Sequence, residues 1–192
     1  EMNLYEVVVS RRTIRCFQDI PIPRPVLERC INAARLAPSA ANLQPLEYIV
    51  VDDEQLLPQV FATLRWAAYI RPLGDPPEGK RPKAYIVILK NSQNSTSYSV
   101  YDVGAAMENI ILVALAEGIG SCPFGAVDRD QLKKILNIPD GCEMPLVIAL
   151  GYPDERAVEE PFSGSVRYWH DKDGVHHVPK KALESVMHWN TF

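Results

Sequence analysis

The sequence lacks the long apolar runs and the strong charge bias that point to membrane or nucleic-acid proteins. No uninterrupted apolar stretch approaches the roughly 18 residues that cross a bilayer. The 20 basic and 24 acidic residues leave a net charge of −4, which offers no global attraction to nucleic acid or anionic lipid. The first residues show no basic segment followed by an apolar core. We therefore expect no signal peptide, no membrane or nucleic-acid partner, and a cytoplasmic location.

The sequence also lacks the usual spacing of metal ligands and nucleophiles. Its four cysteines form no Cys-x-x-Cys pair, and its four histidines all lie at or after residue 170, with none in a His-Glu-x-x-His arrangement. No Gly-x-Ser-x-Gly segment marks a hydrolase nucleophile. We expect no metal site, and the cysteines are best explained as free thiols of a cytosolic protein.

What is present suits one globular domain. A chain of 192 residues with 47% apolar residues can bury a single core, so we expect one domain over residues 1–192. The mixture of helical and β patterns indicates an α/β or α+β fold. A proline-rich loop over residues 71–83 is expected to be the most mobile segment. Apolar periodicity predicts helices at about 4–10, 25–37, 54–68, 101–117 and 129–136, and strands at about 48–51, 84–89, 119–124 and 145–150.

The last 40 residues differ in character from the rest. Apolar and aromatic residues on both sides of Asp-Lys-Asp-Gly, at 171–174, predict a β-hairpin. Trp189 and Phe192 lie near the chain end, where exposure to water is costly. We expect residues 153–192 to be an extension that packs on a surface, such as that of a second subunit.

A basic cluster, Arg-Arg-Thr-Ile-Arg-Cys-Phe, occupies residues 11–17. If this segment is extended, the side chains of Arg11, Thr13 and Arg15 point to one side, because side chains alternate along an extended chain. Two guanidinium groups and a hydroxyl on one face suit a phosphate. A solvated basic patch explains the same residues, and charge alone favours that simpler interpretation.

Two further segments carry groups suited to a ligand. Residues 37–45, Ala-Pro-Ser-Ala-Ala-Asn-Leu-Gln-Pro, offer the amides of Asn42 and Gln44, which can bind the edge of a planar heterocycle, although an ordinary turn is the simpler interpretation. Residues 116–125, Ala-Glu-Gly-Ile-Gly-Ser-Cys-Pro-Phe-Gly, lack the dinucleotide spacing Gly-x-Gly-x-x-Gly and follow a helix rather than a strand. A glycine-permitted close approach of backbone to a ligand remains open there.

Together, the order and spacing of these three segments, with the long helix before the third, resemble the nitroreductase family over about residues 4–152. The resemblance implies a nitroreductase-like α+β fold, in which helices surround a central, mostly antiparallel sheet. It implies an intertwined homodimer with one FMN in each of two interfacial sites. It also implies a ping-pong reaction. NAD(P)H reduces the flavin and leaves, and a small acceptor then binds in its place and is reduced.

The resemblance assigns roles to named residues. Arg11, Arg12 and Thr13 would hold the phosphate and ribityl chain of FMN, and Arg15 would stabilise the negative charge of the reduced ring. Residues Pro38, Ser39, Ala40 and Asn42 would reach the same FMN from the partner subunit. Pro123, Phe124 and Gly125 would line the ring, and the backbone N–H of Phe124 or of Gly125 would lie near its N5 atom. Arg167 is the best match for a basic residue that reaches the phosphate from the carboxy-terminal segment.

Two departures from the family pattern concern the substrate. Leu46 stands where family members often have Trp after Gln-Pro, and the chain has no room for the helical insertion of larger members. The expected function is an FMN-dependent oxidoreductase that reduces a nitroaromatic, a quinone or a similar small acceptor. The alternatives are a flavin enzyme of the same fold with different chemistry, namely flavin fragmentation or dehalogenation, and an FMN-binding protein without turnover.

Overall fold

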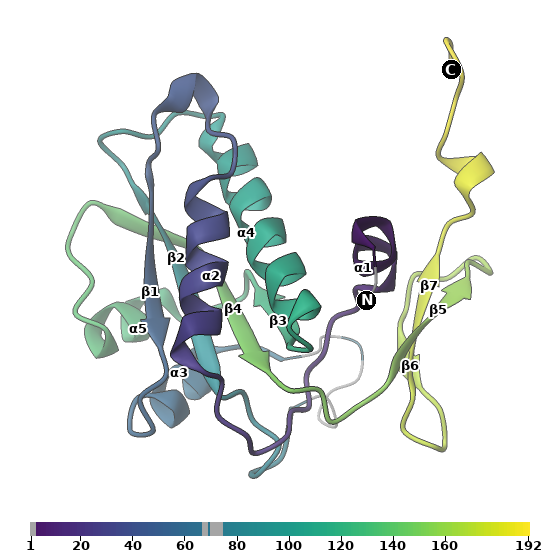
Figure 1. Ribbon diagram of the computed structural model, residues 1–192, viewed down its shortest axis with the longest axis horizontal. Coiled ribbons are helices and arrows are strands. Elements are labelled where there is room, and N and C mark those ends of the chain that lie inside the picture. The colour runs from purple at the N-terminus through teal and green to yellow at the C-terminus, as the bar shows by residue number, and fades with distance from the viewer. Residues whose placement is uncertain (1–2, 67–68, 70–74) are drawn as a thin grey trace.

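The computed structural model describes residues 3–66, 69 and 75–192. Its main body is a four-stranded sheet covered by helices, and a smaller sheet near the carboxyl end stands to one side of it (Figure 1). The strand order of the main sheet is β1-β2-β4-β3, and every neighbouring pair is antiparallel. The α+β class predicted from the sequence is confirmed. The strands are β1 (Leu46–Val51), β2 (Ala84–Asn91), β3 (Gly120–Phe124) and β4 (Cys142–Gly151).

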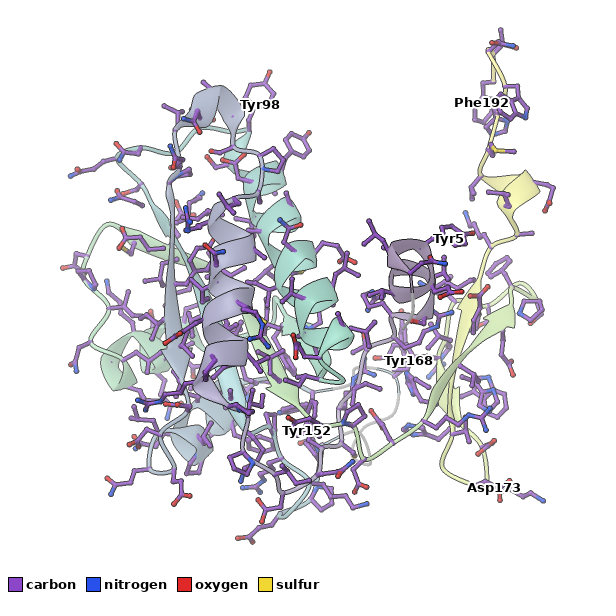
Figure 2. All side chains as sticks on the ribbon, viewed as in Figure 1. Tyr5, Tyr98, Tyr152, Tyr168, Asp173 and Phe192 are labelled. Carbon is purple, nitrogen blue, oxygen red and sulfur yellow. The ribbon has the colours of Figure 1, made fainter. Side chains whose placement is uncertain are left out.

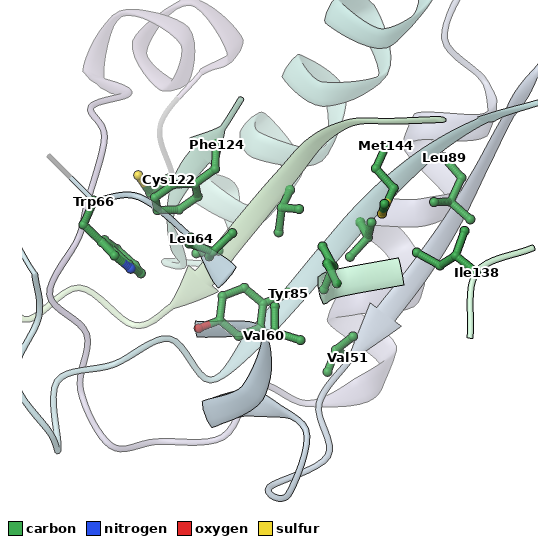
Figure 3. Packing of buried hydrophobic residues seen from close by; sticks show 14 of the residues in the cluster. Val51, Val60, Leu64, Trp66, Tyr85, Leu89, Cys122, Phe124, Ile138 and Met144 are labelled. Carbon is green, nitrogen blue, oxygen red and sulfur yellow. The ribbon is translucent and has the colours of Figure 1, made fainter. Parts of the chain in front are cut away.

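Alternation along β2 explains why both faces of the sheet are covered. Ala84, Ile86 and Ile88 face one core, whereas Tyr85 and Val87 face the other, because successive side chains point to opposite faces. The first core is closed by α2 (Arg24–Arg35) and α4 (Ser99–Ala116). The second core, shown in Figure 3, is closed by α3 (Leu57–Thr63) and α5 (Arg129–Ile135).

Local sequence signals set the helix ends. The helix α1 (Leu4–Ser10) begins with a reciprocal capping box between Asn3 and Glu6. Proline occupies the first turn of α2, where its missing N–H costs no hydrogen bond. The Asp128 side chain accepts the N–H of Gln131 and so starts α5.

Helix α4 is long and apolar enough, by length and composition alone, to cross a membrane. It also carries Asp102 and Glu108, and its buried face packs in the first core, beside α2 on the same face of the sheet. Core helices of this kind pass the same test of length and composition.

The carboxy-terminal extension forms a second, three-stranded sheet. The strand β7 (His176–Lys180) lies at its centre, parallel to β5 (Ala157–Pro161) and antiparallel to β6 (Trp169–His170). The predicted hairpin is confirmed as β6 and β7. After the short 3-10 helix η2 (Leu183–Ser185), the chain runs away from the body and ends at Phe192, which is labelled in Figure 2.

Two features differ from what the sequence predicts, and part of a third lies outside the described residues. The helix expected at 54–68 is only α3, because Leu64 leaves the helix to pair with Val127, and residues 67–68 lie outside the described part. Strand β5 was not predicted. In the loop expected at 71–83, residues 71–74 likewise lie outside the described residues, and residues 75–83 contain no helix or strand.

Candidate functional site

The basic cluster lies directly beside strand β3. Thr13 pairs with Ser121 in a parallel bridge, and the Ile14 N–H donates to the Ser121 carbonyl at 2.9 Å. Two glycines permit this approach: a Cβ on Gly120 would lie 2.8 Å from the Ile14 side chain, and one on Gly151 would lie 2.7 Å from the ring of Phe17. Ile14 and Phe17 are themselves buried in the core, so the cluster is held in a fixed place.

The arginines of the cluster have partners on different elements. Arg11 Nε lies 3.7 Å from Glu108 on α4, and Arg12 Nη2 lies 2.6 Å from Glu159 on β5. Arg15 Nη1 lies 3.3 Å from His176 Nε2 on β7. The cluster therefore joins the main body to the small sheet.

Three observations test whether this region suits a phosphate-bearing flavin. Arg12 Nε is buried and has no hydrogen-bond partner in the described part of the chain, although two Nη donors of this guanidinium are used. A cavity of about 110 Å³ adjoins Arg11, Arg12 and Ser121. A Cβ on Gly125, at the end of β3, would meet nothing within 4 Å, so the space above this backbone is open. A spare cationic donor, a small cavity and an uncovered backbone together fit an anionic, planar ligand.

The end of β3 offers backbone rather than side chains. The Phe124 ring is buried and packs edge-on against Trp66, with ring centroids 4.6 Å apart (Figure 3). Burial raises the pKa of the Cys122 thiol to about 12, so this cysteine is not a thiolate nucleophile at neutral pH. Pro123 is part of the same strand, and Gly125 follows it directly. Any contact that Phe124 and Gly125 make with a ligand above β3 therefore comes from the main chain.

The segment 38–45 lies at the far end of α4 from β3 (Figure 1). Asp102, in the first turn of α4, accepts the hydroxyl of Ser39 at 2.7 Å and the N–H of Ala40 at 3.0 Å. The backbone is in the left-handed region at Ala41, Asn42 and Gln44, with φ of 51°, 54° and 51°. Within one chain, the structure does not bring Pro38, Ser39, Ala40 and Asn42 together with the basic cluster.

Arg167 is linked to the cluster through a tyrosine pair. Its guanidinium lies 5.5 Å from the ring centroid of Tyr69, and that ring lies 5.0 Å from Tyr168. Arg15 in turn lies 5.0 Å from the Tyr168 centroid. Arg15 and Arg167 therefore each make a cation–π contact with one ring of this tyrosine pair.

Sequence reasoning missed three residues that organise the site. Asp102 is a buried carboxylate in a mostly apolar helix, which is the signal that could have marked it. Glu155 accepts the backbone N–H groups of Arg15 and Cys16, and His176 contacts the guanidinium of Arg15. No pattern in the sequence around Glu155 or His176 predicts these contacts. Among residues 3–66, 69 and 75–192, no group of three His, Cys, Asp or Glu side chains could hold a metal ion.

Comparison with known proteins places this geometry in a family. The model of the nitroreductase family matches residues 8–152, which include all three sequence segments singled out above. A protein named NADH dehydrogenase/NAD(P)H nitroreductase from Archaeoglobus fulgidus is 32% identical over 157 residues, covering 78% of this chain and 85% of that protein. An iodotyrosine deiodinase from Thermotoga neapolitana is 27% identical, covering 82% of this chain and 92% of its own length.

Solved structures agree with this placement. A nitroreductase family protein from Clostridium novyi NT is 29% identical with a TM-score of 0.69, covering 79% of this chain and 87% of that one. An iodotyrosine deiodinase bound to FMN and 3-iodo-L-tyrosine shares the fold at 23% identity and a TM-score of 0.69, covering 88% of this chain and all of its own. The family match over most of the chain confirms the resemblance seen in the sequence: this chain belongs to the nitroreductase family.

Proposed function

We propose that the protein is an FMN-dependent oxidoreductase that passes hydride from NAD(P)H to a small organic acceptor. The observation that carries the proposal is the position of the basic cluster against β3, with Thr13 paired to Ser121, inside a chain that matches the nitroreductase family. The family match covers both halves of that contact. Flavin supplies the redox chemistry when it is bound, so the protein needs few acids or bases of its own.

The proposed phosphate site is built on Arg11, Arg12 and Thr13. Arg12 has the spare buried Nε described above, and both arginines line the cavity next to Ser121. Guanidinium groups bind phosphate oxygens through several parallel N–H donors. We propose that Arg167 lies at the edge of this site, where a third cation would reach the same ligand.

The proposed ring site lies between Arg15 and the end of β3. A positive charge at one end of the ring favours the reduced, more negative form. Pro123, Phe124 and Gly125 present main chain to the ring, and the open space above Gly125 admits it. One backbone N–H of this segment, that of Phe124 or Gly125, is proposed to meet the ring atom N5.

We propose that two chains form one intertwined dimer and that each site is completed by the partner. Segment 38–42 is anchored at the first turn of α4, whereas the basic cluster pairs with β3 beyond its last turn, and the 18-residue helix between them is about 27 Å long at 1.5 Å per residue. Trp189 and Phe192 are almost fully exposed in the single chain, at 79% and 107%. Leu4 and Tyr5 of α1 are also exposed, and burial against a second copy accounts for all four side chains.

The acceptor is proposed to be a nitroaromatic, a quinone or a related small compound. Leu46 in place of a bulkier tryptophan favours an open mouth that accepts several shapes. A second candidate, reductive dehalogenation of an aromatic substrate, is favoured by the 27% identity with a deiodinase over most of both chains. We keep reduction of a nitroaromatic, a quinone or a related compound as the main proposal, because the relative at 32% identity is named a nitroreductase.

The test begins with the visible spectrum of the purified protein after addition of FMN. We expect a bound flavin spectrum that NADH or NADPH bleaches under anaerobic conditions, and that a nitroaromatic restores. If 3-iodo-L-tyrosine restores the spectrum of oxidised flavin with release of iodide, and the nitroaromatic does not, the result would favour reductive dehalogenation. Bound FMN that neither nicotinamide bleaches would mean a binding protein without turnover, and a protein that takes up no FMN would end the proposal.

A further inference from the structure

The side chain of Arg15 is held in place without losing its charge. Among the residues that the structure describes, no carboxylate lies within 4.0 Å of this guanidinium, whereas Arg11 and Arg12 each contact one. The guanidinium instead contacts His176, whose Nε2 lies 3.3 Å from Nη1, and the face of Tyr168, whose ring centroid lies 5.0 Å away. Neither partner carries a negative charge: the imidazole nitrogen accepts a hydrogen bond, and the tyrosine ring makes a cation–π contact.

A carboxylate in the place of His176 would fix the guanidinium and also cancel most of its field. A neutral imidazole nitrogen fixes the same group through a hydrogen bond and leaves the full charge for a bound anion. His176 is 2% exposed, at the centre of the small sheet, so its ring cannot easily move away.

The contact with Arg15 also determines which ring nitrogen of His176 carries the proton. A guanidinium only donates, so His176 Nε2 must be the acceptor and the ring proton must be on Nδ1. That proton then points to His170 Nε2, which lies 3.1 Å away. His170 Nε2 lies 4.0 Å from Glu155, and Glu155 accepts the backbone N–H of Arg15. The four residues therefore form a closed ring of contacts that starts and ends at Arg15.

We propose that His176 is a positioning residue that holds the Arg15 guanidinium toward the bound flavin while preserving its charge. This inference rests on the proposed function, because it takes the flavin ring as the group that Arg15 faces. It assigns a role to the carboxy-terminal extension, which lies beyond the residues 8–152 that the family model matches, since β7 supplies the residue that orients a side chain of the main site.

The neighbouring His177 provides a matched control. It lies on the same strand but contacts carboxylates instead, with Nδ1 at 2.5 Å from Glu160 and Nε2 at 3.0 Å from Asp171. We expect His176→Phe to weaken FMN binding by about tenfold, the equivalent of one charge-assisted hydrogen bond, and His177→Phe to change it less than about threefold. His176→Gln keeps an acceptor for Arg15 and should recover most of the affinity.

The reduction potential of bound flavin separates positioning from simple loss of structure. A displaced Arg15 stabilises the reduced ring less, so His176→Phe should shift the potential to a more negative value, and His176→Gln should return it toward that of the wild type. Equal affinity and equal potential in wild type and His176→Phe would overturn the inference. Unequal affinity with an unchanged potential would also overturn it, because that pattern indicates a structural role.

A measurement without flavin tests the contact itself. Nitrogen NMR of histidine-labelled, FMN-free protein should show His176 with its proton on Nδ1, and Arg15→Ala should change the Nε2 signal of His176 but not that of His177. A proton on Nε2 would overturn the inference. Wild-type protein that binds no FMN would overturn the proposed function, whereas wild-type protein that binds FMN no better than His176→Phe would overturn only the role of His176.

Discussion

Two buried groups show how single residues fix the position of longer segments. Gly120 matters because its missing Cβ admits Ile14, and Asp102 matters because it holds two polar groups of a strained loop. Neither residue is expected to touch the flavin. Both act by placing residues that are proposed to contact it.

We expect Gly120→Ala to displace the basic cluster from β3. The added methyl group would meet Ile14 at 2.8 Å, and overpacking of this kind costs about 1–3 kcal/mol. Urea unfolding should report the loss of stability, and FMN titration should report weaker binding. The double variant Ile14→Ala/Gly120→Ala should cost less than the sum of the two single changes. Strict additivity would show that the two side chains do not meet.

Asp102→Ala should loosen the loop at residues 38–45. It leaves the Ser39 hydroxyl and the Ala40 N–H without their acceptor, at a cost of about 2–4 kcal/mol for two bonds to a charged group. Thermal unfolding and FMN affinity should both fall. Glu108→Gln is the control on the same helix, since its ion pair with Arg11 is partly exposed and should change stability by less than about 1 kcal/mol. An Asp102→Ala protein as stable as this control would contradict the argument.

At the scale of elements, the helices and strands that could be predicted are those with an apolar pattern of their own. Helices α2 and α4 and the four main strands follow from apolar periodicity within each segment. Strand β5, Ala-Val-Glu-Glu-Pro, has no such pattern and exists because it pairs with β7 about 20 residues later. The basic cluster was visible as charge, but the partner of Ser39 lies 63 positions away and that of Arg15 lies 161 positions away. Such contacts arise only from the folded chain.

Strand β7 places two adjacent histidines in opposite electrostatic environments. Burial, with the charge of Arg15 next in size, lowers the pKa of His176 to about 4. The hydrogen bond to Asp171 raises the pKa of His177 above its usual value. His176 therefore contributes stability that is complete above about pH 6.5 and is lost as pH falls toward 4. His177 contributes stability that is complete below about pH 6.5 and is lost as pH rises through its raised pKa.

We expect the variants His176→Gln and His177→Gln to change the pH dependence of folding in opposite directions. Relative to wild type, His176→Gln should lose less stability between pH 6.5 and pH 4, whereas His177→Gln should be most destabilised at low pH, where its ion pairs are complete. Urea unfolding of the FMN-free protein at several pH values measures both. Parallel pH profiles for the two variants would contradict the opposite charge states assigned to the two rings.

At the scale of the whole molecule, the exposed tail and the divided site argue for the same dimer. We expect Trp189→Ser combined with Phe192→Ser to weaken dimerisation by up to about a thousandfold, because each lost aromatic side chain removes about 2 kcal/mol of burial and each 1.4 kcal/mol is a factor of about ten. FMN affinity should fall in parallel, since segment 38–42 of one chain is proposed to complete the site of the other. Sedimentation equilibrium with and without FMN measures both quantities.

The exposed residue Lys172, in the turn before β7, offers a matched control, and Lys172→Ser should leave mass and affinity unchanged. A wild-type protein that stays monomeric at all concentrations and still binds FMN tightly would show that a single chain forms the FMN site. In that case Asn42→Ala should leave FMN binding intact. In the dimer it should weaken binding, even though the segment 38–45 that carries Asn42 lies at the far end of α4 from β3, where the basic cluster of the same chain pairs. The response of FMN affinity to Asn42→Ala therefore decides whether one chain or two make the site.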